Sequence, residues 1–228
     1  RYAEFAIPSG RVTVIADAVD VEAFGVRSKT AAREELGIGQ HDYLVMYVGQ
    51  MYAWKGVETL VEAATLAPEG VRIWLVGGTP EELPRIEKLV REPGAGRVKL
   101  VGYVPPTQIP AYLAAADVLA LPNSGRAAVS RYYTSPLKLF EYMAAERPII
   151  ASDLPALREI IANEETALLV PPDDASALAA AVERLRADPA LARRLAANAR
   201  SAVGAHTWER RAARILDFVR SSDRRTVA

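Results

Sequence analysis

The chain has no cysteine among its 228 residues, and its two histidines, His41 and His206, lie far apart in the sequence. Disulfides and thiolate metal sites are therefore excluded, and two distant histidines argue against a histidine-built metal site. The formal net charge is zero, whereas a nucleic-acid-binding domain usually carries a basic excess. No apolar run approaches the roughly 18 residues of a membrane-spanning helix. These absences favour a globular protein of a reducing compartment, so we expect a cytoplasmic location and no nucleic-acid partner.

What the sequence does contain is a regular alternation of short apolar segments with segments of helical periodicity. Continuously apolar strands are typical of a parallel sheet that helices cover on both faces. The alternation predicts an α/β fold, Rossmann-like and doubly wound, with a mostly parallel sheet and helices on both faces. No repeat or linker divides the sequence, so we expect one domain over residues 1–228. The expected strands are 11–16, 43–49, 72–77, 98–102, 118–122, 148–152 and 167–170, and the expected helices are 57–67, 81–91, 107–116, 136–145, 154–162, 175–187, 189–203 and 208–220.

Ligands of such sheets bind where the strands end and helices begin, so the turns after the strands carry the functional signal. The turn after residues 72–77 indicates plain architecture, with Thr79 as helix cap, Pro80 at the first position and Glu82 completing a capping box. We likewise expect Asp117 to serve the start of a strand, and His206 to cap or pack rather than catalyse.

The turn before Pro136 differs, because it has Lys138 where a capping box has Glu or Gln, with Ser135 as the expected cap. A cation in the first helical turn opposes the helix dipole by roughly 0.3–1 kcal/mol. An anion such as phosphate at that helix N-terminus would explain the cation.

A second turn, G-Q-M-Y-A-W-K-G, places Lys55 and Gly56 at the start of another helix. The chain has only five lysines, and two of them at the mouths of helices indicate a diphosphate site. A carboxylate one turn into a largely apolar helix, Glu141, would then hold the two hydroxyl groups of a ribose. Spacing alone leaves the alternative open, since Lys138 and Glu141 could form an ion pair on a solvated helix face.

These residues form a pattern that resembles the C-terminal domain of retaining glycosyltransferases with the GT-B fold, the glycosyl transferases group 1 family. The similarity runs from about Arg11 to Phe218. It rests on strings that occur in the family's order: V-I-A-D-A-V-D-V-E-A-F, Y-V-G-Q-M-Y-A-W-K-G, L-V-G-G-T-P, V-K-L-V-G-Y-V-P, A-A-A-D-V-L-A-L-P-N, S-P-L-K-L-F-E-Y-M-A-A-E-R-P-I-I-A-S-D, A-L-L-V-P-P-D-D and H-T-W-E-R-R-A.

The resemblance implies a role for each turn. Lys55 would bind the donor diphosphate, assisted by Lys138, and Glu141 would hold the ribose, which makes Lys55 and Glu141 the candidate catalytic residues. The expected donor-binding residues as a set are Gly49, Gln50, Lys55, Gly56, Gly102, Tyr103, Val104, Tyr133, Ser135, Pro136, Leu137, Lys138 and Glu141. Of these, Gly102 to Val104 would read the base through the backbone.

Four positions depart from the family pattern. Tyr133 stands where the family has its first acid, and Gln50 stands where an arginine usually joins the lysine. Ala18 and Glu146 replace common glycines. The first two departures favour an alternative, a degenerate sugar-nucleotide-binding or regulatory module. A second alternative is half of a sugar-nucleotide epimerase of the same fold, although this sequence shows no set of acids and a histidine that would surround the sugar.

The resemblance leads us to expect the donor-binding half of an enzyme that transfers a sugar from a UDP-, GDP- or ADP-sugar to an acceptor with retention. We expect neither cofactor nor metal, since no Asp-x-Asp cluster occurs. The chain starts without methionine and enters an apolar pattern at once, so we expect a longer protein whose N-terminal acceptor-binding domain is the partner. Contact of that domain with the inner face of the membrane stays open, and we expect the isolated half to be poorly active.

Overall fold

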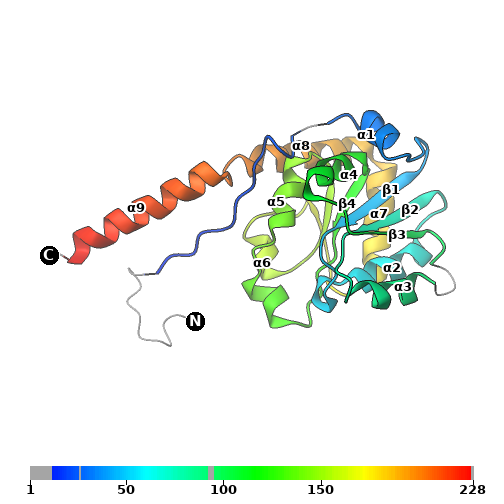
Figure 1. The fold of residues 1–228 in the computed structure, drawn as a ribbon, viewed down its shortest axis with the longest axis horizontal. Helices are drawn as coiled ribbons and strands as arrows, with labels where there is room; N and C mark the ends of the chain where they lie inside the picture. Colours follow the sequence, from blue (N-terminus) through cyan, green and yellow to red (C-terminus); the bar gives the residue numbers. More distant parts are fainter. Residues whose placement is uncertain (1–11, 26, 92–94, 227–228) are drawn as a thin grey trace.

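The structure, a computed structural model, describes residues 12–25, 27–91 and 95–226, and for 222–226 only the backbone. Its centre is a six-stranded sheet in which every pairing is parallel, with the order β3-β2-β1-β4-β5-β6 (Figure 1). The strands are β1 (Tyr43–Val48), β2 (Val71–Val76), β3 (Val98–Gly102), β4 (Val118–Leu121), β5 (Ile149–Ser152) and β6 (Leu168–Val170). The Rossmann-like α/β prediction is confirmed.

Helices cover both faces of the sheet, as the continuously apolar strands predict. On one face α4 and α5 pack on alternate strand residues such as Met46 and Leu119. On the other face α2 and α7 pack on the residues between them, such as Val45 and Val118. The helices are α1 (Lys29–Glu35), α2 (Val57–Leu66), α3 (Leu83–Val90), α4 (Ile109–Ala115), α5 (Leu137–Ala144), α6 (Pro155–Arg158), α7 (Ala175–Ala187), α8 (Pro189–Val203) and α9 (Trp208–Thr226).

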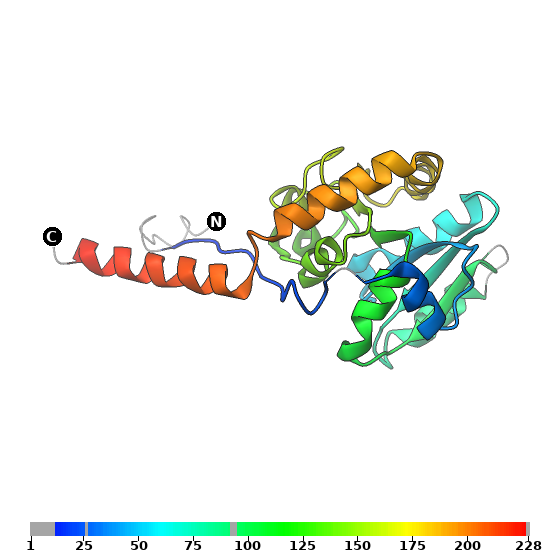
Figure 2. The ribbon, with the colours of Figure 1, turned by 90° about the horizontal axis from the view of Figure 1, so that it is seen from above.

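The strand expected at residues 11–16 is absent over 12–16, and Arg11 lies outside the described residues. Val14 is 73% exposed, and none of the six strands of the described sheet pairs with this apolar segment. The chain instead joins the C-terminal region, where Val19 forms an isolated parallel bridge with Thr207. Figure 2 shows this segment beside α9, which projects away from the sheet.

Two expected helix starts are wrong in detail. The Ser135 hydroxyl does not cap α5, because it accepts a hydrogen bond from the Asp17 backbone N–H at 3.0 Å, and Pro136 takes the cap position instead. At the other start, the Glu82 carboxylate does accept from the Thr79 N–H as a capping box predicts, but Thr79 to Glu82 form a separate turn, and α3 begins at Leu83 with Pro84 in its first turn. The helix expected over 154–162 also stops early, at Arg158.

Strand order reverses between β1 and β4, since the chain runs outward from β1 to β3 and then returns beside β1. At such a switch point the connections leave in opposite directions and open a crevice at the carboxyl ends of the strands. The two lysines that are predicted to bind a diphosphate lie at this switch point. The turn with Lys55 follows β1, and α5, which carries Lys138, follows β4.

Candidate functional site

The end of β1 is where the Lys138 side chain crosses from one face of the sheet to the other. Lys138 belongs to α5, whereas its Nζ donates a 2.7 Å hydrogen bond to the Tyr47 hydroxyl, and Tyr47 packs on the opposite face. Gly49 makes the crossing possible. A Cβ at this position would lie 2.3 Å from Lys138 Nζ, and the backbone φ of +135° also favours glycine. Besides the donor-binding role expected for Gly49, a glycine here leaves room for the Lys138 ammonium.

Tyr47 connects Lys138 to the following turn, because the Tyr47 hydroxyl in turn donates to the Gln50 backbone carbonyl. The resulting chain of hydrogen bonds runs from Lys138 through a fully buried phenol to the residue that begins the Lys55 turn. The Gln50 side chain itself is exposed. Sequence analysis missed Tyr47, although a hydroxyl in an otherwise apolar strand, two residues before a glycine, is a usable signal.

The Lys55 side chain is buried, at 8% exposure, and its ammonium lies 3.8 Å above the Trp54 ring. Within the described part of the chain it forms no ion pair and no hydrogen bond through Nζ. Burial lowers the Lys55 pKa to about 8. A cation that is desolvated and held only by an aromatic face is well placed to receive an anion.

Gly56 ends the Lys55 turn and begins α2 in the left-handed conformation, with φ of +66°. A Cβ here would meet the Pro122 carbonyl oxygen at 1.9 Å, so the turn after β1 lies directly against the end of β4. The Ser124 backbone N–H, just beyond β4, donates to the Trp54 carbonyl at 3.0 Å. Both sides of the switch point are thus joined through backbone atoms that tolerate no side chain at Gly56.

Glu141 lies one helical turn after Lys138 and is half-buried. Burial raises its pKa, and the positive charge of Lys138 opposes that shift. The next residue, Tyr142, is fully buried, and its hydroxyl accepts from the Val48 backbone N–H at 2.8 Å. Tyr142 therefore fixes α5 to the end of β1 and sets the position of Glu141. The solvated Lys138–Glu141 ion pair, the alternative left open above, is wrong, since Lys138 is bonded to Tyr47 instead.

The electrostatics of the two lysines are unusual for cations that share a crevice. The pKa of Lys138 lies well below its usual value, first because of burial and then because of the charge of Lys55, while Glu141 and Glu82 act in the opposite direction. No carboxylate of the described chain forms a salt bridge with either lysine. Two neighbouring amines without a direct counter-ion make a site where a phosphate group would relieve both desolvation and repulsion.

Glu82 holds the Lys55 turn from the side of β2 and has a larger role than the helix start expected from sequence. Its buried Oε2 accepts from the Met51 backbone N–H at 3.1 Å and from the Thr79 N–H at 2.8 Å. Arg85 donates to the Met51 carbonyl and pairs with Glu58 on α2. The carboxylate therefore ties the turns after β1 and β2 together.

The residues expected to read a base lie at the end of β3, further along the same edge of the sheet. Gly102 has a φ of +81° with open space where a Cβ would lie, Tyr103 is 72% exposed and Val104 is buried. The Gly102 carbonyl accepts from the Gly77 N–H at 2.7 Å, which connects this turn to β2. The backbone here is open to an approaching planar group.

The segment between β4 and α5 contains one turn of π-helix, η5 (Val129–Tyr133), a form that is rare and often found at functional sites. Tyr133, half-exposed at 50%, ends this turn, and Leu137 at the start of α5 is 47% exposed, whereas Pro136 is buried. The structure thus places Tyr133, Ser135, Pro136 and Leu137 in one stretch leading into α5, although Ser135 uses its hydroxyl for the N-terminal segment.

Two further features complete the description. In the ranges that the structure describes, no group of three or more His, Cys, Asp or Glu side chains could hold a metal ion. Over those same ranges, no helix has the length and apolar character needed to span a bilayer.

The Asp117 expectation is confirmed, because its carboxylate accepts from the Leu44 backbone N–H at 2.7 Å at the start of β1. His206 packs on the Phe140 ring at 4.9 Å.

Comparison with known proteins agrees with this architecture. A D-inositol 3-phosphate glycosyltransferase from Xylanimonas cellulosilytica is 29% identical over 228 aligned residues, which cover 96% of this chain and 53% of that protein. Among solved structures, sucrose-phosphate synthase from Thermosynechococcus elongatus is 36% identical with a TM-score of 0.78, and covers 90% of this chain and 51% of the other. HepE from Anabaena, solved in complex with UDP, shares the fold with a TM-score of 0.84 at 19% identity, covering 96% and 60%.

The chain therefore spans about half the length of the relatives that it matches. The sequence profile for "Glycosyl transferases group 1" matches residues 42–188, which include β1 to β6 and every turn described above except the N-terminal segment. The sheet of this chain agrees with that match, since it is all-parallel and its strand order reverses between β1 and β4. The likeness of the chain to sucrose-phosphate synthase along 90% of its length agrees with it as well. The chain belongs to the glycosyl transferases group 1 family.

Proposed function

We propose that this chain is the donor-binding half of a glycosyltransferase and binds a nucleoside-diphosphate sugar at the carboxyl ends of β1, β3 and β4. The observation that carries the proposal is the convergence of Lys55, Lys138 and Glu141 on one switch point, where neither amine forms a salt bridge with a carboxylate of the residues that the structure describes. The names of the relatives support the reaction class, and HepE, a chain of the same fold, was solved in complex with UDP.

In this proposal each group acts on a different part of the donor. Lys55 and Lys138 hold the diphosphate, the backbone around Gly102 and Val104 contacts the base, and the Glu141 carboxylate accepts hydrogen bonds from the ribose hydroxyls. As the sugar leaves, negative charge grows on the diphosphate, and amines already fixed in a dry crevice stabilise it without rearrangement. Sugar transfer with retention, to an acceptor held by an N-terminal domain, is part of the same proposal, as is donor binding without a metal.

Calorimetric titration of the chain with UDP, GDP and ADP tests the proposal. We expect saturable binding with a preference for one base, and an affinity about ten- to a hundredfold weaker in Glu141→Ala, because a carboxylate that accepts two hydroxyl hydrogen bonds contributes roughly 1.5–3 kcal/mol. Glu62→Ala, an exposed carboxylate on α2, is the matched control and should bind like the parent. Absence of binding to all three nucleotides, or equal effects of the two variants, would refute the assignment.

A second candidate function, a sugar-nucleotide-binding module without catalysis, is favoured by one specific observation. Tyr133 occupies the position of the family's first acid, and it lies half-exposed in η5 rather than presenting a carboxylate to the crevice. The two functions are separated by joining the chain to its N-terminal half and measuring sugar release from the preferred donor. Tight nucleotide binding without transfer or hydrolysis would favour the binding module.

A further inference from the structure

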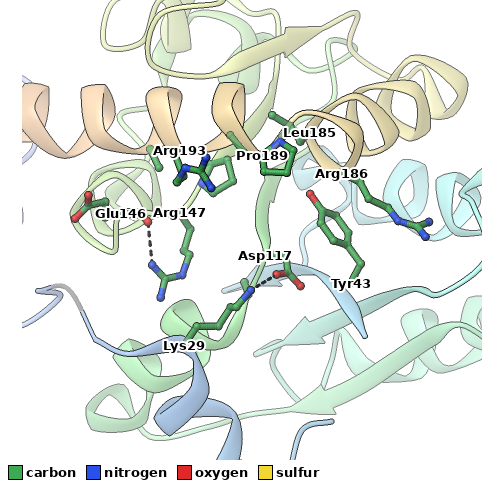
Figure 3. Close-up of a pocket in the computed structure, with 13 residues that line it drawn as sticks. Lys29, Tyr43, Asp117, Glu146, Arg147, Leu185, Arg186, Pro189 and Arg193 are labelled. Carbon is green, nitrogen blue, oxygen red and sulfur yellow. Dashed lines mark hydrogen bonds and ion pairs between the residues drawn. The ribbon is translucent and has the colours of Figure 1, made fainter. Parts of the chain in front are cut away.

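A cavity of about 430 Å³ lies at the opposite edge of the sheet from Lys55 and Lys138, beside the amino ends of β1, β4 and β5 (Figure 3). The α7–α8 hairpin forms its roof, and the start of α1 reaches it from below. Its volume falls within the range of small-molecule sites, roughly 300–1,000 Å³. Nothing in the donor-binding proposal uses this cavity.

Positive charge predominates in the lining of the cavity, which has four cations, Lys29, Arg147, Arg186 and Arg193, against the two acids Asp117 and Glu146. Arg147 donates to the carbonyls of Ala114, Ala145, Glu146 and Arg27, and within the described chain to no carboxylate. Arg33, fully buried, donates to four carbonyls and to Asp117.

Asp117 is the acid at the centre of this cluster, and it is fully engaged. It receives Arg33 and Lys29, each at 2.6 Å, in addition to the Leu44 N–H. One carboxylate therefore forms ion pairs with two cations, and Arg147 adds a third positive charge. The remaining acid of the lining, Glu146, turns its carboxylate away from the side of the cavity where Tyr43 lies (Figure 3).

Two donors at the cavity form no hydrogen bond and no ion pair within the described chain. Arg193 on α8 forms no hydrogen bond or ion pair there, although ten other arginines form salt bridges with acids. The half-buried Tyr43 hydroxyl, at the start of β1, likewise makes no hydrogen bond and points toward the α7–α8 hairpin (Figure 3). Burial raises the Tyr43 pKa, so this hydroxyl keeps its proton and remains a donor.

The walls between these donors are apolar, and are formed by Ala116, Pro148, Leu185, Pro189, Ala192 and Ala196. A site for an inorganic ion would gain nothing from such walls, whereas a small organic group would bury apolar surface on them. A phosphate monoester combines both requirements. Its terminal oxygens can accept from a guanidinium, a phenol and an ammonium, and the planar guanidinium fork suits phosphate geometry.

We propose that this cavity is a second ligand site, distinct from the donor crevice, for a small organic phosphate whose phosphoryl group is held by Arg193, Tyr43 and Lys29. The organic part lies against the apolar wall beneath α8. Binding here bridges α8 to the amino ends of β1 and β4.

Isothermal titration with phenyl phosphate, which pairs a phosphoryl group with an apolar ring, tests this site in the whole chain. We expect saturable binding at concentrations below about 10 mM, weaker by about tenfold in Arg193→Ala and by a smaller factor in Tyr43→Phe. Arg194→Ala is the matched control, since Arg194 is exposed on the same helix and its guanidinium bonds to the Glu164 carbonyl outside the cavity. Inorganic phosphate should bind more weakly than phenyl phosphate, and saturating UDP should leave phenyl phosphate binding unchanged.

Four outcomes overturn the proposal. They are the absence of saturable binding in a folded parent chain, equal losses in Arg193→Ala and Arg194→Ala, equal affinity for inorganic phosphate, and competition by UDP or loss in Lys55→Ala. The last outcome would place the probe in the donor crevice. Failure of UDP itself to bind would count against the donor proposal alone, because phenyl phosphate is measured without nucleotide.

Discussion

Two glycines with nearly the same backbone conformation separate the cost of a left-handed φ from the cost of a steric clash. Gly37 has φ of +64° and open space where a Cβ would lie, whereas Gly56 has φ of +66° and the Pro122 oxygen 1.9 Å from that position. We expect Gly37→Ala to lower the free energy of unfolding by about 1 kcal/mol, the strain of the left-handed region alone. Gly56→Ala should cost about 3 kcal/mol or more, because the end of β4 must move.

Urea unfolding of both variants measures this difference. The two substitutions are chemically identical, so the comparison isolates the contact between the Lys55 turn and β4. Equal losses in the two variants would show that the turn is not held against β4 as the structure describes. A larger loss in Gly56→Ala, accompanied by weaker nucleotide binding, would tie that contact to the donor crevice.

Lys55 also makes nucleotide affinity depend on pH. Its pKa in the free chain is about 8, because burial disfavours the charged form. A bound diphosphate favours the ammonium and raises that pKa, so the complex holds a proton that the free chain loses above pH 8. Affinity should therefore be greatest below pH 8 and should fall as the pH rises, by at most about tenfold per pH unit for one proton.

Titration of the preferred nucleotide between pH 7 and 9.5 measures this slope. Lys55→Arg keeps its charge throughout that range and should flatten the dependence, and Lys88→Arg, at an exposed position of α3, should leave it intact. Lys138 faces the same crevice, and its pKa is also lowered by burial. A slope that survives in Lys55→Arg would assign the proton to Lys138 and contradict the prediction.

At the scale of single residues, sequence identified the glycines and lysines of the crevice but not the groups that hold them. Gly49 and Lys138 stand out because of their type and place, yet the crossing of Lys138 over β1 follows from packing between α5 and Tyr47. For Glu82 the sequence indicates only a helix start, because a capping box is a local pattern and the bond of Glu82 to Met51 is not. Contacts between residues distant in sequence carry no local signal.

At the scale of elements, Glu82 connects the turns after two neighbouring strands, and its loss should loosen the Lys55 turn. Glu82→Ala leaves the Met51 and Thr79 N–H groups without their acceptor in a buried place. We expect the free energy of unfolding to fall by about 2–4 kcal/mol, since each buried unpaired donor costs roughly 1–3 kcal/mol. Amide hydrogen exchange should accelerate at Met51 and Thr79 before the sheet as a whole exchanges.

Glu81→Ala is the control for this prediction, because the neighbouring carboxylate is exposed and hydrogen-bonds only locally, at Thr79. Its unfolding free energy and its Met51 exchange rate should match those of the parent chain. Unchanged Met51 protection in Glu82→Ala would show that the carboxylate does not fix the turn, whatever the loss of global stability.

The strands that are buried on both faces of the sheet, and the helices with a regular apolar face, were predictable from sequence. The strands β1 and β4 and the helices α7 and α8 follow from continuous apolar runs and helical periodicity, and residues 175–187 and 189–203 have the predicted bounds. The strand expected near residues 12–16 failed because an apolar extended segment forms a strand only beside a partner. Only Ala32 and Arg33 of the short helix α1 are buried, so its apolar periodicity gives a sequence-based prediction no clear bounds.

At the scale of the whole molecule, the two edges of the sheet differ in what they present. The carboxyl edge between β1 and β4 gathers the paired lysines and Glu141, and the amino edge gathers the cavity under the α7–α8 hairpin. The core between them is continuous on both faces of the sheet. The strand order fixes both places, since it decides which strand ends are neighbours.

The C-terminal helix α9 contributes no described residue to this core. From position 212 to 221 every residue except the half-buried Phe218 is exposed, and Figures 1 and 2 show the helix projecting away from the sheet. The apolar side chains of Ile215, Leu216 and Val219 lie at 43–52% exposure. The beginning of the helix is anchored, by the 2.6 Å ion pair of Arg211 with Asp17.

Two truncations test where the folded core ends. Removal of residues 212–228 deletes a segment whose described side chains, 212–221, are all exposed except the half-buried Phe218, and should change the free energy of unfolding by no more than about 0.5 kcal/mol. Removal of residues 206–228 also deletes the Val19 N–H bond to the His206 carbonyl and the packing of His206 on Phe140, and should cost about 2 kcal/mol. Urea unfolding measures both, with UDP binding as a check on the crevice.

Because α5 carries both Phe140 and the proposed ribose ligand Glu141, the longer truncation should also weaken UDP binding while the shorter one leaves it unchanged. Equal losses of stability in the two truncated chains would mean that the anchor at the beginning of α9 does not support α5.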